Sequence, residues 1–327
     1  MLSHRERLQA CLSDDPALDR PPVALWRHFP VDDQAPGTLA AATLDFQRQY
    51  DFDLVKLTPA SSFCLIDWGA EDVWEGHTEG TRRYVQRVVH SPQDWERLPL
   101  LDPRRAPRLA DQLDCLRQVR AALPPETPVL QTVFSPLAQA RNLAGAETLL
   151  AHLRLQPEAV LAGLETIAET TRRFVEAAVE TGIDGIFYAV QHAQAFLLTL
   201  DEYRQFGLPA DGQALAPARG LWCNLLHLHG LQVYFDLVPY LGLPIVNWHD
   251  RETPPTLAQA RQAFGGVLCG GISQQTIVYQ DRDRVRAEAA DALQQTGGRR
   301  FILGTGCVVP VIAPHGNLQV TRDSVAI

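Results

Sequence analysis

Short apolar, β-branched runs recur along this chain of 327 residues, and segments with helical periodicity separate most of them. The runs lie at 23–29, 53–59, 129–136, 185–192, 221–230, 244–250, 266–273 and 301–307. Between them, apolar residues recur at the three- and four-residue spacing of a helix. The helices predicted in this way cover 39–50, 107–122, 157–181, 201–207, 256–264 and 282–296. Strands that alternate with helices pair in parallel, and this number of strands predicts a (β/α)₈ TIM barrel.

A doubly wound open sheet is the alternative architecture for such an alternation. No predicted strand is followed by a GxGxxG or GxxxxGK[ST] phosphate loop, so neither nucleotide-binding signature favours it. Residues 60–106, with SSFCLIDWGAEDVWEG and RRYVQRVVH, predict a β-rich insertion after the second strand. The sequence has no Gly/Ser linker, low-complexity tract or internal repeat, so we expect one domain over residues 1–327.

The charge balance bears on the kind of partner that the protein binds. Lys and Arg total 29 against 38 Asp and Glu, which gives a formal net charge of −9 without a block of like charge. This argues against a nucleic acid or an anionic membrane and favours a small molecule or another protein. No apolar run has the length of a membrane span, and MLSHRERLQACL predicts a charged amphipathic helix rather than a signal peptide, so we expect a cytoplasmic protein. The six cysteines lack framework spacing and are expected to be free thiols.

Polar and ionisable residues gather near the carboxyl ends of the predicted strands, where the loops of a barrel build its site. These residues are Trp26, Arg27, His28, Lys56, Thr58, Gln191, His192, His227, His229, Asn247, His249, Asp250 and Cys307. A single histidine near a strand end is commonly a hydrogen-bonded structural group. Histidines at several strand ends that meet at one rim favour a functional site instead.

Among these residues, His227 and His229 in the stretch NLLHLHG have the spacing that most clearly indicates a metal site. Residues i and i+2 of a strand project from the same face, so the two imidazoles point together while Leu228 points away. Neutral imidazole suits zinc, and a thiolate from another strand would give three ligands with an open fourth position, as in catalytic zinc sites. Cys307 is the candidate thiolate because the glycines of GTGCVVP allow close approach. The alternatives are two hydrogen-bonded histidines and a small buried thiol.

The other rim residues suggest roles in binding and catalysis. Arg27 and Lys56 would anchor a carboxylate, sulfonate or phosphate, or else form salt bridges with acids such as Asp53 or Asp250. The predicted substrate-binding residues are Trp26, Arg27, Lys56, Gln191 and Asn247. The predicted catalytic residues, which would supply a fourth ligand, an orienting carboxylate or a proton donor, are His192, His249 and Asp250. The run NWHDRET is equally typical of a loop with a capping Asp.

The strand order, the HLHG element, the GGIS turn, and ILGTGCVVP followed by PHGN together resemble the uroporphyrinogen decarboxylase superfamily over nearly the whole chain. That superfamily contains (β/α)₈ decarboxylases and zinc-dependent methyltransferases, which move a methyl group between a corrinoid protein and a thiol such as coenzyme M. The decarboxylases share an Arg-rich element near the N-terminus, an Asp, a Tyr and a His. Here the first strand reads WRHF, and the other three positions align with Thr58, Asn142 and Thr305. The resemblance therefore argues against porphyrinogen decarboxylation.

The methyltransferase branch is the more similar one. It binds zinc through a His-x-Cys at the fifth strand and a Cys in a GxGC turn at the eighth. His227 matches its first ligand and Cys307 its last, while His229 stands where the branch has cysteine. The resemblance implies that these three residues bind Zn²⁺, that an acceptor thiol attacks the methyl group as thiolate, and that a separate protein carries the corrinoid.

The histidine at position 229 alters the charge of such a centre. Zn²⁺ with two thiolates and one imidazole is formally neutral, whereas two imidazoles and one thiolate leave one positive charge. That zinc would lower the pKa of a bound thiol or water effectively but would hold the resulting anion more tightly. The fourth position is therefore left open between a substrate thiolate and an oxygen ligand. We expect a zinc-dependent methyltransferase, with another zinc lyase, hydrolase or decarboxylase, or a metal-free binding protein, as alternatives.

Overall fold

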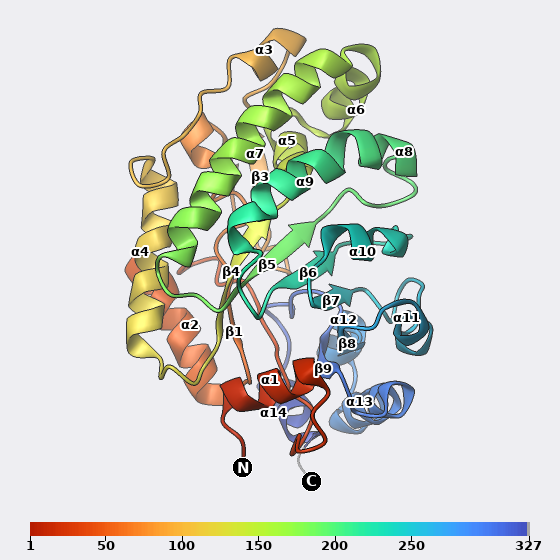
Figure 1. The fold of residues 1–327 in the computed structure, drawn as a ribbon. Coiled ribbons are helices and arrows are strands. Elements are labelled where there is room, and N and C mark those ends of the chain that lie inside the picture. The colour runs from red at the N-terminus through yellow and green to blue at the C-terminus, as the bar shows by residue number, and fades with distance from the viewer. Residues whose placement is uncertain (326–327) are drawn as a thin grey trace.

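The computed structural model describes residues 1–325, and a seven-stranded parallel sheet forms its centre, with helices around it (Figure 1). The strands are β1 (Val55–Leu57), β4 (Val129–Phe134), β5 (Gly185–Val190), β6 (Leu225–Leu228), β7 (Ile245–Trp248), β8 (Val267–Ile272) and β9 (Phe301–Thr305). They lie in this same order in the sheet, each parallel to the next. Every strand residue is buried, as is typical of parallel strands covered on both faces.

The first predicted strand, 23–29, is the exception, and its prediction as a regular strand was wrong. One isolated bridge joins Val23 to Leu303 of β9. The backbone of this segment is still hydrogen-bonded to β9 on one side and to the residues before β1 on the other. The Ala24 N–H donates to the Leu303 carbonyl at 2.9 Å, and the Asp53 N–H donates to the Val23 carbonyl at 2.8 Å. Beyond Ala24 the pairing with β9 ends, because the Trp26 carbonyl instead accepts the N–H of Val309, which lies after that strand, at 2.8 Å.

The helices connect the strands and run along the outside of the sheet (Figure 1). They are α1 (His4–Ser13), α2 (Pro36–Tyr50), α3 (Pro92–Glu96), α4 (Pro107–Ala122), α5 (Pro136–Ala144), α6 (Ala146–Leu155), α7 (Pro157–Val179), α8 (Leu200–Glu202), α9 (Leu208–Leu215), α10 (Val238–Leu241), α11 (Leu257–Ala263), α12 (Gln274–Tyr279), α13 (Arg282–Thr296) and α14 (His315–Asp323). The predicted helices 107–122 and 282–296 coincide with α4 and α13. The predicted helix 201–207 is instead the first half of a longer one, because a π-helical turn at Tyr203–Gly207 joins α8 to α9.

Between β1 and β4 the chain forms a small antiparallel pair of strands, β2 (Glu71–Val73) and β3 (Arg83–Gln86). The loop between them is fixed to the rest of the molecule, since the Val311 N–H donates to the Thr78 carbonyl at 2.7 Å. Arg82, just before β3, forms an ion pair of 2.6 Å with Asp33. Most of the predicted β-rich stretch 60–106 is loop and short helix around this pair.

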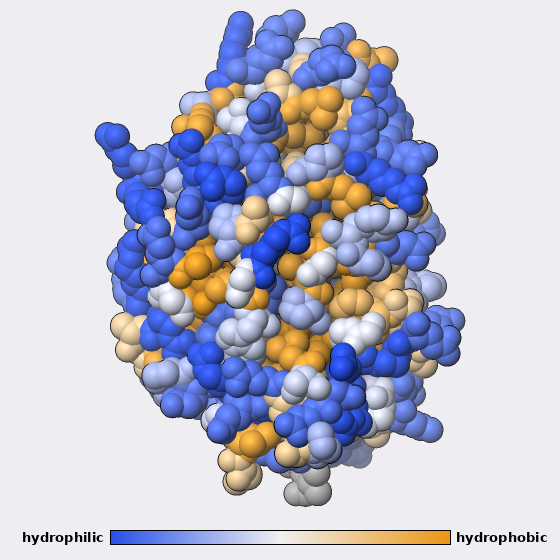
Figure 2. Space-filling view, in the orientation of Figure 1, coloured by the Kyte–Doolittle hydropathy of each residue, from blue (hydrophilic) through white to orange (hydrophobic). Residues whose placement is uncertain are grey.

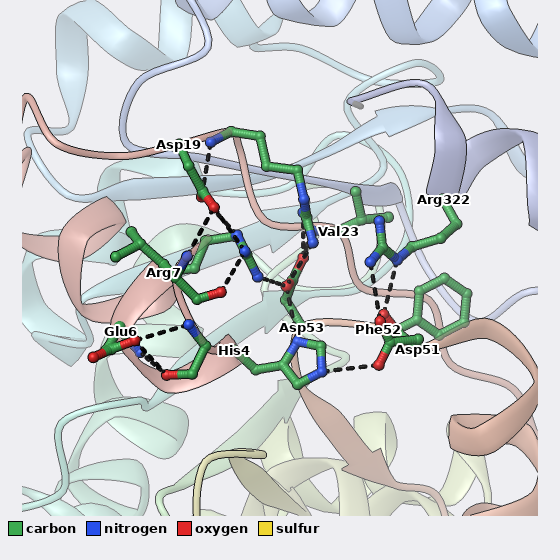
Figure 3. A network of polar contacts seen from close by, with 12 residues as sticks. His4, Glu6, Arg7, Asp19, Val23, Asp51, Phe52, Asp53 and Arg322 are labelled. Carbon is green, nitrogen blue, oxygen red and sulfur yellow. Dashed lines mark hydrogen bonds and ion pairs between the residues drawn. The ribbon is translucent and has the colours of Figure 1, made fainter. Parts of the chain in front are cut away.

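A network of charged side chains ties α1 to the amino end of β1 (Figure 3). The carboxylate of Asp53 is fully buried and accepts hydrogen bonds from Arg7, Arg20 and the Val23 N–H, each at 2.7 Å, and from His4 at 3.0 Å. Burial alone would raise the pKa of Asp53, but the hydrogen bonds from His4 and Arg20 outweigh it and hold this pKa well below its usual range.

The same network reaches the C-terminal helix. The second ring nitrogen of His4 lies 2.9 Å from Asp51, and Arg322 of α14 donates to Asp51 at 3.2 Å. Both ends of the described chain therefore lie on one side of the molecule, as Figure 1 shows. This side is opposite to the carboxyl ends of the strands, where the residues predicted to be functional lie.

Hydrophilic residues dominate the face drawn in Figure 2, with apolar areas between them. Within residues 1–325, no helix combines the length and the hydropathy that crossing a membrane requires.

We predict that Asp53→Asn lowers the free energy of unfolding by about 3–5 kcal/mol, because it leaves the guanidinium of Arg20 without its carboxylate and removes one of the two carboxylates that pair with the buried Arg7. Urea unfolding at pH 7 measures this change. Asp45→Asn, which breaks the exposed pair with Arg48, is the control and should leave the midpoint unchanged.

The pH dependence provides a second check on Asp53. A carboxyl group with a lowered pKa contributes its stability fully above its unfolded pKa of about 3.9, and this contribution is lost as the pH falls through the folded pKa. The difference between the wild type and Asp53→Asn should therefore narrow below about pH 4. A difference that stays constant down to pH 2 would contradict the assignment of the effect to the ionised carboxylate.

Candidate metal centre

Four side chains at the carboxyl ends of β6, β7 and β9 form a compact cluster of atoms that can bind a metal. His227, His229, His249 and Cys307 each offer one ligand atom, and these atoms lie within 4.8 Å of one another. The Cys307 sulfur lies 3.6 Å from His227 Nε2 and 3.5 Å from His229 Nδ1, and the two nitrogens are 3.4 Å apart. Ligands at zinc bond lengths in a tetrahedron lie about 3.3–3.8 Å from one another. The three-residue set predicted from the sequence therefore comes together at the spacing of a zinc site.

The strand geometry explains how the histidine pair is held. His227 is a residue of β6, and its neighbour on β7 is Asn247. His229 follows the strand, but its N–H still donates to the Val190 carbonyl at 2.8 Å, so the ladder with β5 continues through it. The alternation of side chains is thereby kept from His227 to His229, and both rings reach the same centre.

Cys307 reaches the centre because the turn after β9 passes very close to β7. A side chain at Gly306 would lie 2.8 Å from the His249 Cα and 2.9 Å from the Trp248 carbonyl oxygen. Glycine is therefore the residue that this approach requires, which is the physical reason for the GTGC pattern. The Thr305 hydroxyl donates to the carbonyl of Cys307 and fixes the turn.

Asn247 sets the tautomer of His227. The Asn247 amide nitrogen donates to the carbonyls of Cys269 at 2.9 Å and Thr305 at 3.0 Å, so its oxygen faces His227, 2.6 Å from Nδ1. An amide oxygen accepts hydrogen bonds, so the proton of His227 lies on Nδ1. The lone pair of Nε2 then points to Cys307 and His229, as a metal ligand requires. The sequence predicted that Asn247 binds substrate; in the structure its side chain orients the ring of His227.

His249 joins the cluster from the residue after β7. Its Nε2 atom is buried and has no hydrogen-bond partner among the described residues. The His249 ring lies 5.1 Å from the His229 ring and 6.0 Å from the His227 ring, measured between centroids. An unpartnered buried nitrogen is costly without a ligand, so this position suits a fourth metal ligand or a hydrogen-bond partner of a bound molecule.

Burial governs the protonation of the cluster. It lowers the pKa of His229 to about 4 and of His249 to about 3, and it lowers the pKa of His227 well below its ordinary value. The three imidazoles are therefore neutral at pH 7, the form that binds metals. Burial raises the pKa of Cys307 to about 12, and a divalent cation would favour its thiolate instead. These residues fit Zn²⁺.

A cavity of about 60 Å³ adjoins the cluster. It is lined by Trp26, His28, Lys56, Ser61, Glu79, Thr81, Thr132, Phe134, Phe187, Ala189, Gln191, His227, His229, Cys307 and Val308. The predicted substrate-binding residues Trp26, Lys56 and Gln191 are thus brought together beside the metal ligands.

Lys56 and Trp26 offer donors to this cavity. The buried Lys56 ammonium lies 4.4 Å from the centre of the Phe187 ring and donates to Thr58 Oγ1 at 3.1 Å. No carboxylate lies within ion-pair distance of it in residues 1–325, and burial lowers its pKa to about 7. The indole N–H of Trp26 is buried without a partner among the same residues. The alternative of a salt bridge between Lys56 and Asp53 is not realised. Asp53 lies at the amino end of β1, where it pairs with Arg7 and Arg20.

Other predicted site residues lie away from this cavity. The Arg27 guanidinium lies 5.3 Å from the centre of the Phe29 ring and 5.9 Å from that of Phe46. Both carboxylate oxygens of Asp250 accept the Gly271 N–H at 3.1 Å, and burial raises the pKa of Asp250 to about 7. Asp250 thus supports the backbone of the GGIS turn.

His192 faces a second cavity, between α5, α6 and the segment after β5. It follows Gln191, and consecutive residues of an extended chain project to opposite sides. This explains why Gln191 and His192 line different cavities.

The loop between β2 and β3 supplies cavity residues that the strand-end pattern missed, namely Glu79 and Thr81. Gly80 has a φ of +77°, and a side chain there would lie 2.5 Å from the Cβ of His28. This glycine lets the loop approach the cavity wall. The glycine in the polar stretch HTEGT is the one feature of the sequence that indicates this close approach of the loop.

Two sequence comparisons bear on the family. A model of the uroporphyrinogen decarboxylase (URO-D) family matches residues 15–326. Uroporphyrinogen decarboxylase from Rhodococcus opacus (strain B4) is 27% identical over 249 residues, which make up 72% of this chain and 68% of that protein.

Solved structures share the fold. A methyltransferase from Methanosarcina mazei superposes with a TM-score of 0.85 at 19% identity, over 99% of both chains. A B12-independent methionine synthase from Shewanella sp. W3-18-1, in complex with selenomethionine, superposes with a TM-score of 0.55 at 15% identity, over 93% of this chain and 90% of that one. With a family match over nearly its whole length and a fold of the same kind, this chain belongs to the uroporphyrinogen decarboxylase family.

Proposed function

We propose that this protein is a zinc-dependent methyltransferase that transfers a methyl group between a corrinoid carried by a separate protein and a thiol acceptor. The observation that carries the proposal is the convergence of His227, His229 and Cys307, whose donor atoms lie 3.4 to 3.6 Å apart beside a cavity. The structural likeness to a methyltransferase supports the same reaction class.

The residues that would hold Zn²⁺ are His227, His229 and Cys307, with His249 as a further ligand when no substrate is bound. Bound zinc supplies a Lewis acid that stabilises the thiolate form of an acceptor thiol. We also propose that the segment around Val23 completes a (β/α)₈ barrel, as one domain, because its backbone bonds to both β9 and the residues before β1.

The chain's own side chains would direct the reaction in the following way. Lys56 and Trp26 bind an anionic group of the acceptor, since both offer donors without an acidic partner among the described residues. Phe187 and Phe134 exclude water from the cavity. The acceptor thiol would release its proton to solvent as it binds, since burial lowers the pKa of His249 to about 3 and this ring holds no extra proton at pH 7. The sulfur attacks the methyl carbon. A carbon–sulfur bond forms as the cobalt–carbon bond breaks, and the electron pair of that bond stays on cobalt.

The second candidate is a zinc lyase, hydrolase or decarboxylase. His229 in place of a cysteine leaves a positive charge on the zinc centre, which favours an oxygen ligand over sulfur. A metal-free binding protein would have the clustered histidines hydrogen-bonded to backbone groups or to Asp250. This alternative is less well supported, because His227 bonds to Asn247 instead and the Nε2 atom of His249 lacks a partner in residues 1–325.

We predict about one zinc ion per chain in protein purified without chelators, and loss of that zinc in His227→Ala and Cys307→Ser. Elemental analysis measures the zinc. Methyl transfer from methylcobalamin to 2-mercaptoethanesulfonate, followed by absorbance, should be lost in the same variants. The controls His90→Ala and Cys115→Ala change residues outside the cluster and should keep both properties. Wild-type protein without zinc would overturn the proposal, and zinc without methyl transfer to any thiol would favour the second candidate.

Asn247→Ala tests the tautomer of His227. We predict that it weakens zinc binding about 10- to 100-fold, because His227 loses the acceptor that holds its proton on Nδ1. Competition with a chromophoric chelator measures the affinity. Asn317→Ala is the matched control, since Asn317 also donates from its amide to two carbonyls, those of Ile277 and Gln280, far from the cluster. Equal zinc affinities in the two variants would contradict the role of Asn247.

His229→Cys distinguishes sulfur from oxygen chemistry. We predict that this variant keeps its zinc and transfers methyl groups to thiols several-fold faster, because a second thiolate leaves the centre neutral and its bound sulfur more nucleophilic. Steady-state rates with methylcobalamin and a thiol give the comparison. A zinc-loaded variant with slower transfer would show that the histidine serves a different substrate.

A further inference from the structure

A second cavity lies between α6 and the segment that joins β5 to α8. Its volume is about 150 Å³, and it shares no lining residue with the cavity at the metal cluster. Its walls are apolar, with Leu149 and Leu150 from α6 and Leu197 and Leu198 from the segment after β5. Phe196, 60% exposed, lies at the edge of the cavity.

The inner polar groups of this cavity are Arg141 and His192, while the exposed Glu147 of α6 lines its rim. His192 is 8% exposed, and its Nδ1 atom has no hydrogen-bond partner in the described part of the chain. Burial, followed by the charge of Arg141, lowers the pKa of His192 to about 3. The ring is therefore neutral at pH 7 and has a free nitrogen directed at no protein group. A buried polar atom of this kind calls for a ligand.

Arg141 has no acidic partner. Its guanidinium donates to the Asn142 side-chain oxygen at 2.9 Å, and no carboxylate within residues 1–325 forms an ion pair with it. A second arginine, Arg87, lies near it and donates to the Asn142 carbonyl at 2.7 Å, also without an acidic partner in those residues. Burial and the charge of Arg141 lower the pKa of Arg87. Two neighbouring guanidinium groups that form no ion pair within residues 1–325 create a positive potential at the inner end of the cavity, which an anion would neutralise.

We propose that this cavity binds a small organic anion, a carboxylate with an apolar body. The carboxylate oxygens accept from the forked guanidinium of Arg141 and from His192, and the hydrocarbon body packs against the leucines and under Phe196. The apolar walls and the small volume favour such a molecule over a nucleotide or a phosphosugar. The site is independent of the metal ligands, although Gln191 and His192, adjacent in the chain, line the two cavities on either side.

Isothermal titration calorimetry with hexanoate tests the proposal, with hexanamide as a neutral probe of the same shape. We expect hexanoate to bind at least tenfold more tightly than hexanamide, and Arg141→Gln to reduce hexanoate binding at least tenfold. Arg141→Lys, which keeps the charge, should bind with intermediate affinity. The matched control is Arg117→Gln, an exposed arginine of α4 that should bind hexanoate as the wild type does.

Two further variants locate the bound anion. Leu150→Trp fills the apolar part of the cavity and should abolish binding, whereas Lys56→Met should leave it unchanged. If Lys56→Met abolishes binding and Arg141→Gln does not, hexanoate occupies the metal cavity and the proposal fails. Equal affinity for hexanoate and hexanamide, or no binding of hexanoate to a folded wild type, also overturns it. Because none of these measurements requires zinc or methyl transfer, their outcome is separate from that of the proposed function.

Discussion

The amide of Asn247 links four strands of the sheet at the functional end. Its nitrogen donates to carbonyls of β8 and β9, while its oxygen accepts the proton of His227 on β6. Such a side chain has no freedom to rotate, because a flip would place donors against donors and acceptors against acceptors. The ring of His227 is held in one tautomer as a result. The compact arrangement of the other ligands depends on this ring, since both Cys307 and His229 approach its Nε2 atom.

The charge of the groups around the four-residue cluster bears on which metal it would bind. Neutral imidazoles, a protonated thiol and an unpaired ammonium group on Lys56 share a buried region in which no carboxylate contacts the ligand atoms among the described residues. An acidic ligand such as aspartate would bind harder cations, and its absence from the four-residue cluster favours zinc over magnesium or calcium. Asp250, the one acidic residue that the sequence placed at the rim, accepts the Gly271 N–H and so holds this backbone.

Much of the fold and the centre of the site were predictable from the sequence, because they follow from local periodicity. Seven of the eight predicted strands are present, and the two-residue spacing of His227 and His229 places both rings on one side. The positions of Arg27 and His192 were not predictable in this way. Each lies near a strand end, but whether its side chain turns to the cavity depends on the loop after the strand and on packing against Phe29 or Arg141. The contribution of Glu79 was missed because its loop is far in sequence from any parallel strand.

The loop between β2 and β3 lines the cavity with Glu79 and Thr81, comes close to His28 at Gly80, and is anchored by Arg82 and by the Thr78 carbonyl. None of the four clustered side chains that could bind a metal comes from it. The molecule thus separates two tasks between different parts of the chain: the carboxyl ends of central strands carry the candidate ligands, while a peripheral hairpin borders the adjoining cavity. A change in this hairpin would alter the cavity without disturbing the residues that could hold a metal.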